Sequence, residues 1–452
     1  MGLPRSVFLN PCDYLLFSDQ SLRMQRKQGP NIPYMCMDID GPLDPERMRR
    51  SVARATAASP TTLARLRFSR FNGRPLWRLP QDPMTAAQEA LNDTYRSVDV
   101  CGSGIPYDEP TATTGGSPSD LRDGPQICLT HYALAHGRSR LCIRWPHWLM
   151  DAAGAMAFLD VWATCYAECG DDAILAEPVV PDARQWQPLA GTGLRERWRT
   201  IRSQPKSKSK LRIGAPYDEA SGTVREDRVL HRYWNETEMA QIRAAARNEM
   251  PAGPARITRY LAVCVIQALD QLFQENGWSG DAFRIALPMR MSENTPDHTA
   301  LRLLFGNYLV SPIIVIDRRI AGDRTRLSED LTQQLQAFQK ARGPVAQWSL
   351  MSLAALLPFA VHRRIISSPM FATQFSSGFS FYGELHPPLR SVGGMRISNL
   401  WGGGPTTLPP GMNPVFSRFD QSLNLALTYA WPVVSDETAK QYLVHVENML
   451  TA

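Results

Sequence analysis

The stretch RERWRTIRSQPKSKSKLR, residues 195–212, divides the chain into two parts of similar length and so limits the folds open to it. It carries eight Lys or Arg residues against one Glu, which accounts for the whole formal net charge of +6. The rest of the sequence is near neutral and lacks basic-aromatic interleaving, which argues against nucleic-acid binding. We therefore predict an N-terminal half at residues 1–190, a basic linker at 191–224 and a C-terminal half at 225–452.

The N-terminal half mixes strand and helix patterns. YMCMDIDGPL, from Tyr34, predicts a strand, and DPERMRRSVARATAAS predicts a helix with Asp44 as its N-cap and Pro45 at its first position. Hairpins are predicted at 62–79, turning at Asn72-Gly73, and at 126–145, turning around His136-Gly137. A long surface loop is predicted at 101–124, and an amphipathic helix begins at about Ala152.

The C-terminal half repeats this mixture. Strand patterns occur at 228–234, 283–291, 306–317 and 422–433, and helix patterns at 235–249, 258–277 and 436–450, the last with Asp436 as its predicted cap. The sequence therefore predicts an α/β or α+β fold in two related layers. Hydrophobic residues make up 44% and charged residues 20%, which is ordinary for a folded protein of the cytoplasm.

The segment RWPHWLMDAAG, residues 144–154, places His147 and Asp151 where a strand gives way to a helix. Pro146 cannot continue a central ladder, so His147 is expected at the rim of the sheet. A histidine with a pKa near 6.5 takes a proton at neutral pH, as acyl transfer to an alcohol or amine requires. Two plainer interpretations stay open, because Asp151 could be only a helix N-cap and His147 a satisfied structural histidine.

The surrounding sequence resembles the condensation-domain and coenzyme-A-dependent acyltransferase superfamily, which has the chloramphenicol acetyltransferase fold. HWLMDAAG resembles its HHxxxDG motif, IALPMRM its central strand ending in Arg290, and FGNYLVSPIIVID its following strand with Gly306 and Asn307. RISNLWGGGP is similar to its late Ser-Asn-Leu segment, found in wax-ester-synthase-like and other freestanding members. The closing residues 423–450 resemble its last strand and helix. In order and spacing the resemblance covers nearly the whole chain.

The resemblance implies two chloramphenicol-acetyltransferase-like halves, a pseudo-dimer within one chain, with a channel between them. It makes His147 the general base, and makes Asp151 a support of the motif through an ion pair for which Arg290 is the candidate. Further residues are expected to line or brace the channel: Trp148, Gly154, Asn307, Ser398, Asn399 and Trp401.

The implied function is transfer of an acyl group from a thioester, on coenzyme A or an acyl or peptidyl carrier protein, to a small-molecule hydroxyl or amine acceptor. Such enzymes serve secondary or lipid metabolism. Pro146 stands where the family has its first histidine, and Ala152 where it has a glycine. These departures keep a second hypothesis open, a catalytically silent module that binds a carrier protein or partner enzyme. A third is an unrelated α/β protein with fortuitous motif matches.

No bound cofactor is expected. The sequence has no G-x-S-x-G elbow, P-loop, HExxH or G-x-G-x-x-G pattern, and its eight cysteines show no CxxC or zinc spacing. Buried free thiols in a reducing compartment are predicted, with cytoplasmic localisation. No signal peptide and no membrane span are expected, and a freestanding monomer is the predicted state.

The basic run at 195–212 has three interpretations. A solvated linker is the favoured one. The others are a docking site for an acidic carrier protein or for coenzyme A phosphates, and contact with an anionic membrane surface through Trp198.

Overall fold

The computed structural model describes eleven stretches of the chain. They are residues 4–26, 28–100, 122–168, 187–189, 191–204, 211–216, 226–253, 255–291, 305–368, 375–384 and 389–451. Most of the loop predicted at 101–124 and part of the linker predicted at 191–224 lie outside the described residues.

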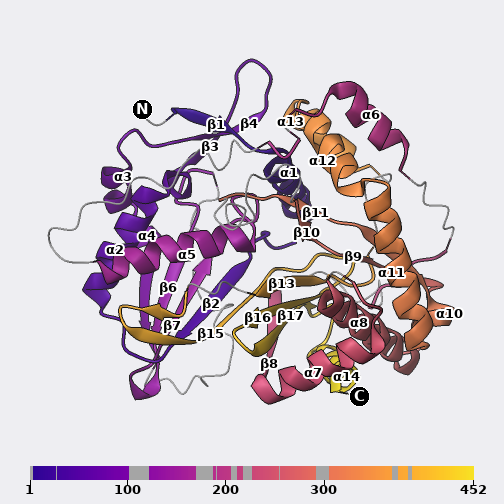
Figure 1. The fold of residues 1–452 in the computed structure, drawn as a ribbon. Helices are drawn as coiled ribbons and strands as arrows, with labels where there is room; N and C mark the ends of the chain where they lie inside the picture. Colours follow the sequence, from indigo (N-terminus) through magenta and orange to yellow (C-terminus); the bar gives the residue numbers. More distant parts are fainter. Residues whose placement is uncertain are drawn as a thin grey trace.

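The first half is built on a six-stranded sheet in the order β14-β15-β2-β7-β6-β5 (Figure 1). Helices α2 and α5 pack against each other over this sheet. All pairings are antiparallel except β5 with β6. The elements are β2 (Tyr34–Ile39), α2 (Pro45–Ala58), β5 (Tyr95–Asp99), β6 (Cys128–Ala133), β7 (Ser139–Arg144), α5 (Ala152–Ala167), β14 (Ser391–Val392) and β15 (Met395–Gly403).

The second half is built on a four-stranded sheet in the order β13-β16-β17-β8, with β9 and β12 paired separately. Helix α8 is its buried centre, because fourteen of its twenty residues are buried between the strands and helices α7, α11 and α14. The elements are β8 (Glu226–Trp234), α7 (Glu236–Glu249), α8 (Arg256–Glu275), β9 (Ala282–Ala286), β12 (Ile313–Asp317), α10 (Arg318–Ala321), α11 (Arg324–Lys340), β13 (Ser380–Glu384), β16 (Met412–Phe419), β17 (Ser422–Trp431) and α14 (Asp436–Thr451).

The remaining elements flank the two sheets. A small sheet, β1-β4-β3, and the pair β10-β11 lie outside them. Helix α1 packs against α12 and α13, so the first helix of the chain joins helices of the second half. The elements are β1 (Ser6–Phe8), α1 (Pro11–Gln25), η1 (Pro60–Leu63), β3 (Arg65–Phe68), β4 (Pro75–Arg78), α3 (Pro83–Glu89), α4 (Leu91–Thr94), η2 (Ala135–Gly137), α6 (Leu194–Arg202), β10 (Met289–Arg290), β11 (Leu309–Val310), α12 (Gly343–Ala354) and α13 (Phe359–Ile366).

Local sequence signals explain several elements. The Asp44 side chain accepts a hydrogen bond from Arg47 N, which confirms the predicted N-cap of α2. The β6–β7 hairpin turns through His136 and Gly137, with φ of 59° and 66°, and the β3–β4 hairpin turns through Gly73, with φ of 62°. Each predicted hairpin is therefore confirmed at its predicted turn.

Two expectations need correction or refinement. The predicted linker contains an ordered helix, α6, whose Glu196 pairs with Arg342 of the second half. Helix α14 is capped by Ser435, whose hydroxyl accepts from Thr438 N, because Asp436 instead binds Arg228 and Tyr429. A third expectation is confirmed, because the six cysteines within the described residues are all buried.

The two halves are connected by an exchanged strand. β15 comes from the C-terminal part of the sequence but pairs with β2 of the first sheet, from Ile397 opposite Ile39 to Gly403 opposite Tyr34. In Figure 1 this late strand crosses from the second half into the first. A boundary drawn at residues 191–224 alone therefore misses a strand that structurally completes the first half.

Candidate active site

A tight loop between β7 and α5 carries His147. The His147 backbone N donates to Asn31 O at 2.9 Å, and Leu149 N donates to Pro146 O at 2.8 Å. The buried Trp145 indole closes the loop by donating to Met150 O at 2.8 Å. These bonds fix the backbone on both sides of the histidine, as a positioned base requires.

Asp151 holds the end of this loop in two ways. Its Oδ1 accepts from Gly154 N at 2.9 Å and caps α5, and its Oδ2 lies 3.2 Å from Arg290 Nε in an ion pair. The same Oδ2 accepts from Tyr308 N at 3.3 Å. The helix cap and the arginine pair are therefore both present, and Asp151 ties the histidine loop to β10 of the second half.

Asn307 supports the loop from behind. Its Nδ2 donates to His147 O at 2.7 Å and to Asp13 Oδ1 at 2.8 Å, and its backbone carbonyl accepts from Asn10 Nδ2 at 3.0 Å. Asn10 and Asp13 form the capping box of α1. Three distant segments thus meet at one buried amide, which lies beneath the His147 backbone.

A cavity of about 600 Å³ lies between the two halves and is open to His147. Its apolar wall includes Leu16, Leu287, Met289, Leu309, Leu335 and Phe381, and its polar lining includes Asp19, Arg23, Asn31, His147, Asp151 and Arg290. Ala152, at the family's glycine position, also lines it. A largely apolar cavity with a few convergent polar groups is the usual form of a small-molecule site.

The His147 imidazole is suited to accept a proton. Burial lowers its pKa from the ordinary value of 6.5, and contributions from its own carbonyl, Asp151 and Asn307 only partly offset this effect. The neutral ring is therefore the form present at neutral pH.

A second pair of ionisable residues, Asp19 and Arg23, lines the cavity and was not predicted from the sequence. Burial raises the pKa of Asp19, and the neighbouring Arg23 and His147 oppose that shift. Arg23 is buried and donates to Thr406 O at 2.7 Å and Gly29 O at 3.2 Å. Both residues lie on α1, one turn apart and therefore on the same face of the helix. The sequence alone does not show that this face borders a cavity.

Several residues expected to line the channel lie elsewhere. The cavity lining does not include Trp148, Gly154, Asn307, Ser398, Asn399 or Trp401. Trp148 is buried in the core of the first half. A Cβ at Gly154 would lie 2.7 Å from Met150 Cβ and 3.2 Å from Gly306 N, so this glycine permits close packing rather than substrate entry.

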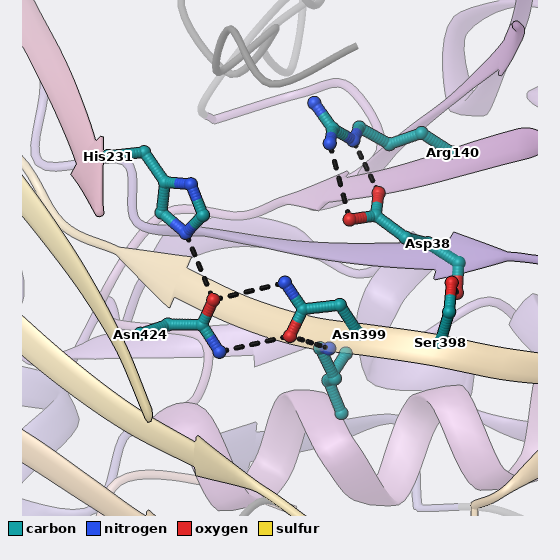
Figure 2. A network of polar contacts seen from close by, with 7 residues as sticks. Asp38, Arg140, His231, Ser398, Asn399 and Asn424 are labelled. Carbon is teal, nitrogen blue, oxygen red and sulfur yellow. Dashed lines mark hydrogen bonds and ion pairs between the residues drawn. The ribbon is translucent and has the colours of Figure 1, made fainter. Parts of the chain in front are cut away.

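The late segment braces the two sheets, as Figure 2 shows, and bracing was one of the two roles expected for Asn399 and Trp401. The Asn399 and Asn424 side chains exchange two hydrogen bonds of 3.0 Å, and His231 Nε2 lies 3.0 Å from Asn424 Oδ1. Trp401 is buried and stacks on His231 with ring centroids 4.1 Å apart. β15, β17 and β8 are thereby joined next to the buried ion pair of Asp38 and Arg140.

No cluster of three His, Cys, Asp or Glu side chains in the described part of the chain has an arrangement that could hold a metal ion. Among the helices whose residues are described, none combines the length and the apolar character needed to cross a bilayer.

Comparisons with known proteins identify the fold. No family model and no curated protein matches the sequence. The first condensation domain of the calcium-dependent antibiotic synthetase is 14% identical, with a TM-score of 0.66 over 99% of this chain and 97% of that chain. Trichothecene 15-O-acetyltransferase from Fusarium sporotrichioides is 11% identical, with a TM-score of 0.66 over 99% and 95%.

A third solved structure extends this likeness. The starter condensation domain of rhizomide synthetase, in complex with C8-CoA and Leu-SNAC, is 13% identical, with a TM-score of 0.64 over 99% of this chain and 94% of that chain. The chain thus has the mixed α/β fold of condensation domains and related acyltransferases, with two chloramphenicol-acetyltransferase-like halves. The fold predicted from the sequence is confirmed.

Proposed function

We propose that this chain, folded as condensation domains and related acyltransferases are, transfers an acyl group from a thioester to a hydroxyl or amine acceptor. The observation that carries the proposal is the position of His147. It is a neutral histidine on a clamped loop, at the wall of an apolar cavity that both halves build.

In the proposed step, the His147 imidazole takes the proton of the acceptor O–H or N–H as that atom attacks the thioester carbonyl. A carbon–oxygen or carbon–nitrogen bond forms, the carbon–sulfur bond breaks, and the proton held by His147 passes to the leaving thiolate. The thiol of coenzyme A or of a carrier's prosthetic arm is released. A positioned base of this kind typically contributes about 10²–10⁴-fold to the rate.

Asp151, Arg290 and Asn307 are positioning residues in this proposal. The Asp151–Arg290 pair holds the start of α5 against the second half, and Asn307 binds the His147 carbonyl. Neither contact needs the family's first histidine, so Pro146 in its place leaves the base supported.

Donor and acceptor would both reach His147 through the cavity. Its apolar wall suits an acyl chain, and the Asp19–Arg23 side suits the polar part of an acceptor or of the thioester arm. C8-CoA is present in the rhizomide synthetase structure, which supports an acyl-coenzyme A donor here without excluding a carrier-bound one.

The test is thiol release by the wild-type protein from a panel of acyl thioesters, with and without pooled small alcohols and amines. We expect release that depends on the acceptor, together with an ester or amide product of the corresponding mass. Release that is independent of any acceptor would indicate a hydrolase. Absence of release together with tight binding of a carrier protein would favour the catalytically silent module.

A further inference from the structure

One edge of the molecule is built from four short stretches that are rich in arginine. We call this surface the arginine face and define it as residues 4–9, 69–75, 191–204 and 343–368. They contain nine arginines and one acidic residue, Glu196: Arg5, Arg70, Arg74, Arg195, Arg197, Arg199, Arg202, Arg363 and Arg364. Glu196 is itself neutralised by Arg342 at 2.7 Å. The face therefore presents almost uniform positive charge.

The four stretches are neighbours in space. β1 pairs with β4, and Phe359 N at the start of α13 donates to Gly73 O at the tip of the β3–β4 hairpin. Helix α6 packs against α12. In Figure 1, β1, the β3–β4 hairpin, α13 and α6 lie along the upper edge.

Large apolar side chains project from this same face. Phe71 at the hairpin tip is 101% exposed, Leu194 and Trp198 on α6 are 65% and 53% exposed, and Leu356 is 62% exposed. Most other large apolar side chains among the described residues are buried, so four exposed ones on one edge need an explanation. A groove of about 610 Å³, lined by Phe8, Leu194, Leu353 and Leu356, runs between α6 and β1.

Helix α6 is basic and amphipathic on its solvent side. Arg195, Arg199 and Arg202 are exposed at steps of four and three, and Leu194 and Trp198 lie on the adjoining stripe. Helices that lie in a membrane interface place Trp and Leu among the headgroups and pair Arg with anionic lipids. Charge alone would also suit an acidic protein, but apolar tips on three separate elements suit a broad planar surface better than a shaped pocket.

We propose that the arginine face binds an anionic lipid bilayer, so that the protein works at a membrane surface without spanning it. Phe71, Leu194 and Trp198 enter the headgroup region, and the arginines meet the lipid phosphates and carboxylates. The groove beside α6 then faces the acyl chains of the lipids. Each arginine near such a surface raises the affinity about fivefold, and the effect is screened by salt.

The test is vesicle flotation of the full chain. The probes are vesicles of phosphatidylcholine alone and of phosphatidylcholine mixed with phosphatidylserine, at low and high salt. We expect flotation with the anionic vesicles at low salt and loss of it at high salt. Arg195→Glu/Arg199→Glu should lower the vesicle affinity by at least about twentyfold. Phe71→Ala/Trp198→Ala should lower it several-fold while preserving some salt-sensitive binding.

The matched control is Arg50→Glu/Arg247→Glu, which makes the same charge change at exposed arginines of α2 and α7 outside the arginine face. Circular dichroism shows whether each variant is folded. The proposal is overturned if wild type does not bind anionic vesicles or binds both vesicle types equally. It is also overturned if the control variant loses as much vesicle affinity as Arg195→Glu/Arg199→Glu. It is also overturned if a purified acidic carrier protein, and no vesicle, binds through Arg195 and Arg199.

Discussion

Arg290 Nε lies 3.2 Å from Asp151 Oδ2, so one ion pair joins the two halves directly beside the loop of His147. Asp151 is buried and Arg290 is only 19% exposed in its side chain. Removing one partner of an ion pair in this setting strongly destabilises the fold, because the other charge is left without compensation. The pair therefore connects the geometry of the base to the packing of the halves.

Asp151→Asn removes the ion pair and disturbs the bond from Tyr308 N to the same oxygen, but it keeps the helix cap, because asparagine caps a helix as well as aspartate does. We expect acyl transfer to fall about a hundredfold through displacement of His147, and the free energy of unfolding to fall by about 1–3 kcal/mol. Steady-state kinetics and urea unfolding measure the two effects. In a cycle with Arg290→Gln, the double variant should lose less than the sum of the singles, whereas simple additivity would show that the two residues act independently.

Asn307→Ala removes the bond to the His147 carbonyl and leaves the buried Asp13 with fewer partners. We expect kcat to fall about tenfold or more while the KM values change little, because Asn307 does not line the cavity. Stability should fall by about 1–3 kcal/mol. The matched control is Asn276→Ala, which loses a side-chain bond to Leu272 O at the far end of α8. An equal loss of kcat in the control would show that the effect on Asn307→Ala is one of stability only.

The pH dependence of kcat/KM reports the protonation of His147 in the free enzyme. Burial lowers its pKa, so the neutral, proton-accepting form persists below pH 6.5. We expect activity to be constant through neutral pH and to decline on an acid limb centred below 6.5. An acid limb centred above about 7 would mean that the active base is not the desolvated histidine described here.

Asn399→Ala tests whether the late segment braces the sheets or binds substrate. Both hydrogen bonds to Asn424 are lost, so we expect the free energy of unfolding to fall by about 1–3 kcal/mol. The KM values should be unchanged because this residue lies outside the cavity lining. A large rise in either KM with unchanged stability would restore the substrate-binding role that the sequence suggested.

His231 lies 3.0 Å from Asn424 in the same contact between the sheets, and it makes the free energy of unfolding depend on pH in a definite direction. Burial lowers its folded-state pKa to about 4, whereas the unfolded chain takes the proton near 6.5. Between these values the unfolded chain binds more protons, so this histidine makes wild type less stable as the pH falls. The stability of His231→Gln relative to wild type should therefore increase between about pH 7.5 and about pH 5, as measured by urea unfolding. A relative stability that is constant or decreases on acidification would contradict this role.

Several elements of the fold and the histidine loop could be predicted from the sequence because their signals are local, whereas the two-halves architecture was implied by the family resemblance. Asp44 before Pro45, the turn at His136-Gly137 and the strand that ends before Pro146 each show their structure within a few residues. The pairing of Asp151 with Arg290 followed from the family resemblance, and the two side chains do lie in contact.

The rest of the site depends on contacts between distant segments. Asn10 and Asp13 have the pattern of an ordinary capping box, and only the fold brings them to Asn307. Asp19 and Arg23 become cavity residues because α1 packs at the junction of the halves. Trp401 was expected to line the channel or to brace it, and the register of β15 with β2 directs it toward His231 and the bracing contacts.

The most direct test of the central claim compares acceptor-dependent thiol release by wild type, His147→Ala and His136→Asn. His136 is an exposed histidine at φ 59°, a conformation that asparagine tolerates, so its replacement controls for loss of a histidine alone. We predict that His147→Ala loses about a hundredfold or more in rate while His136→Asn matches wild type. Equal rates in wild type and a folded His147→Ala would contradict the account, because the base would then lie elsewhere.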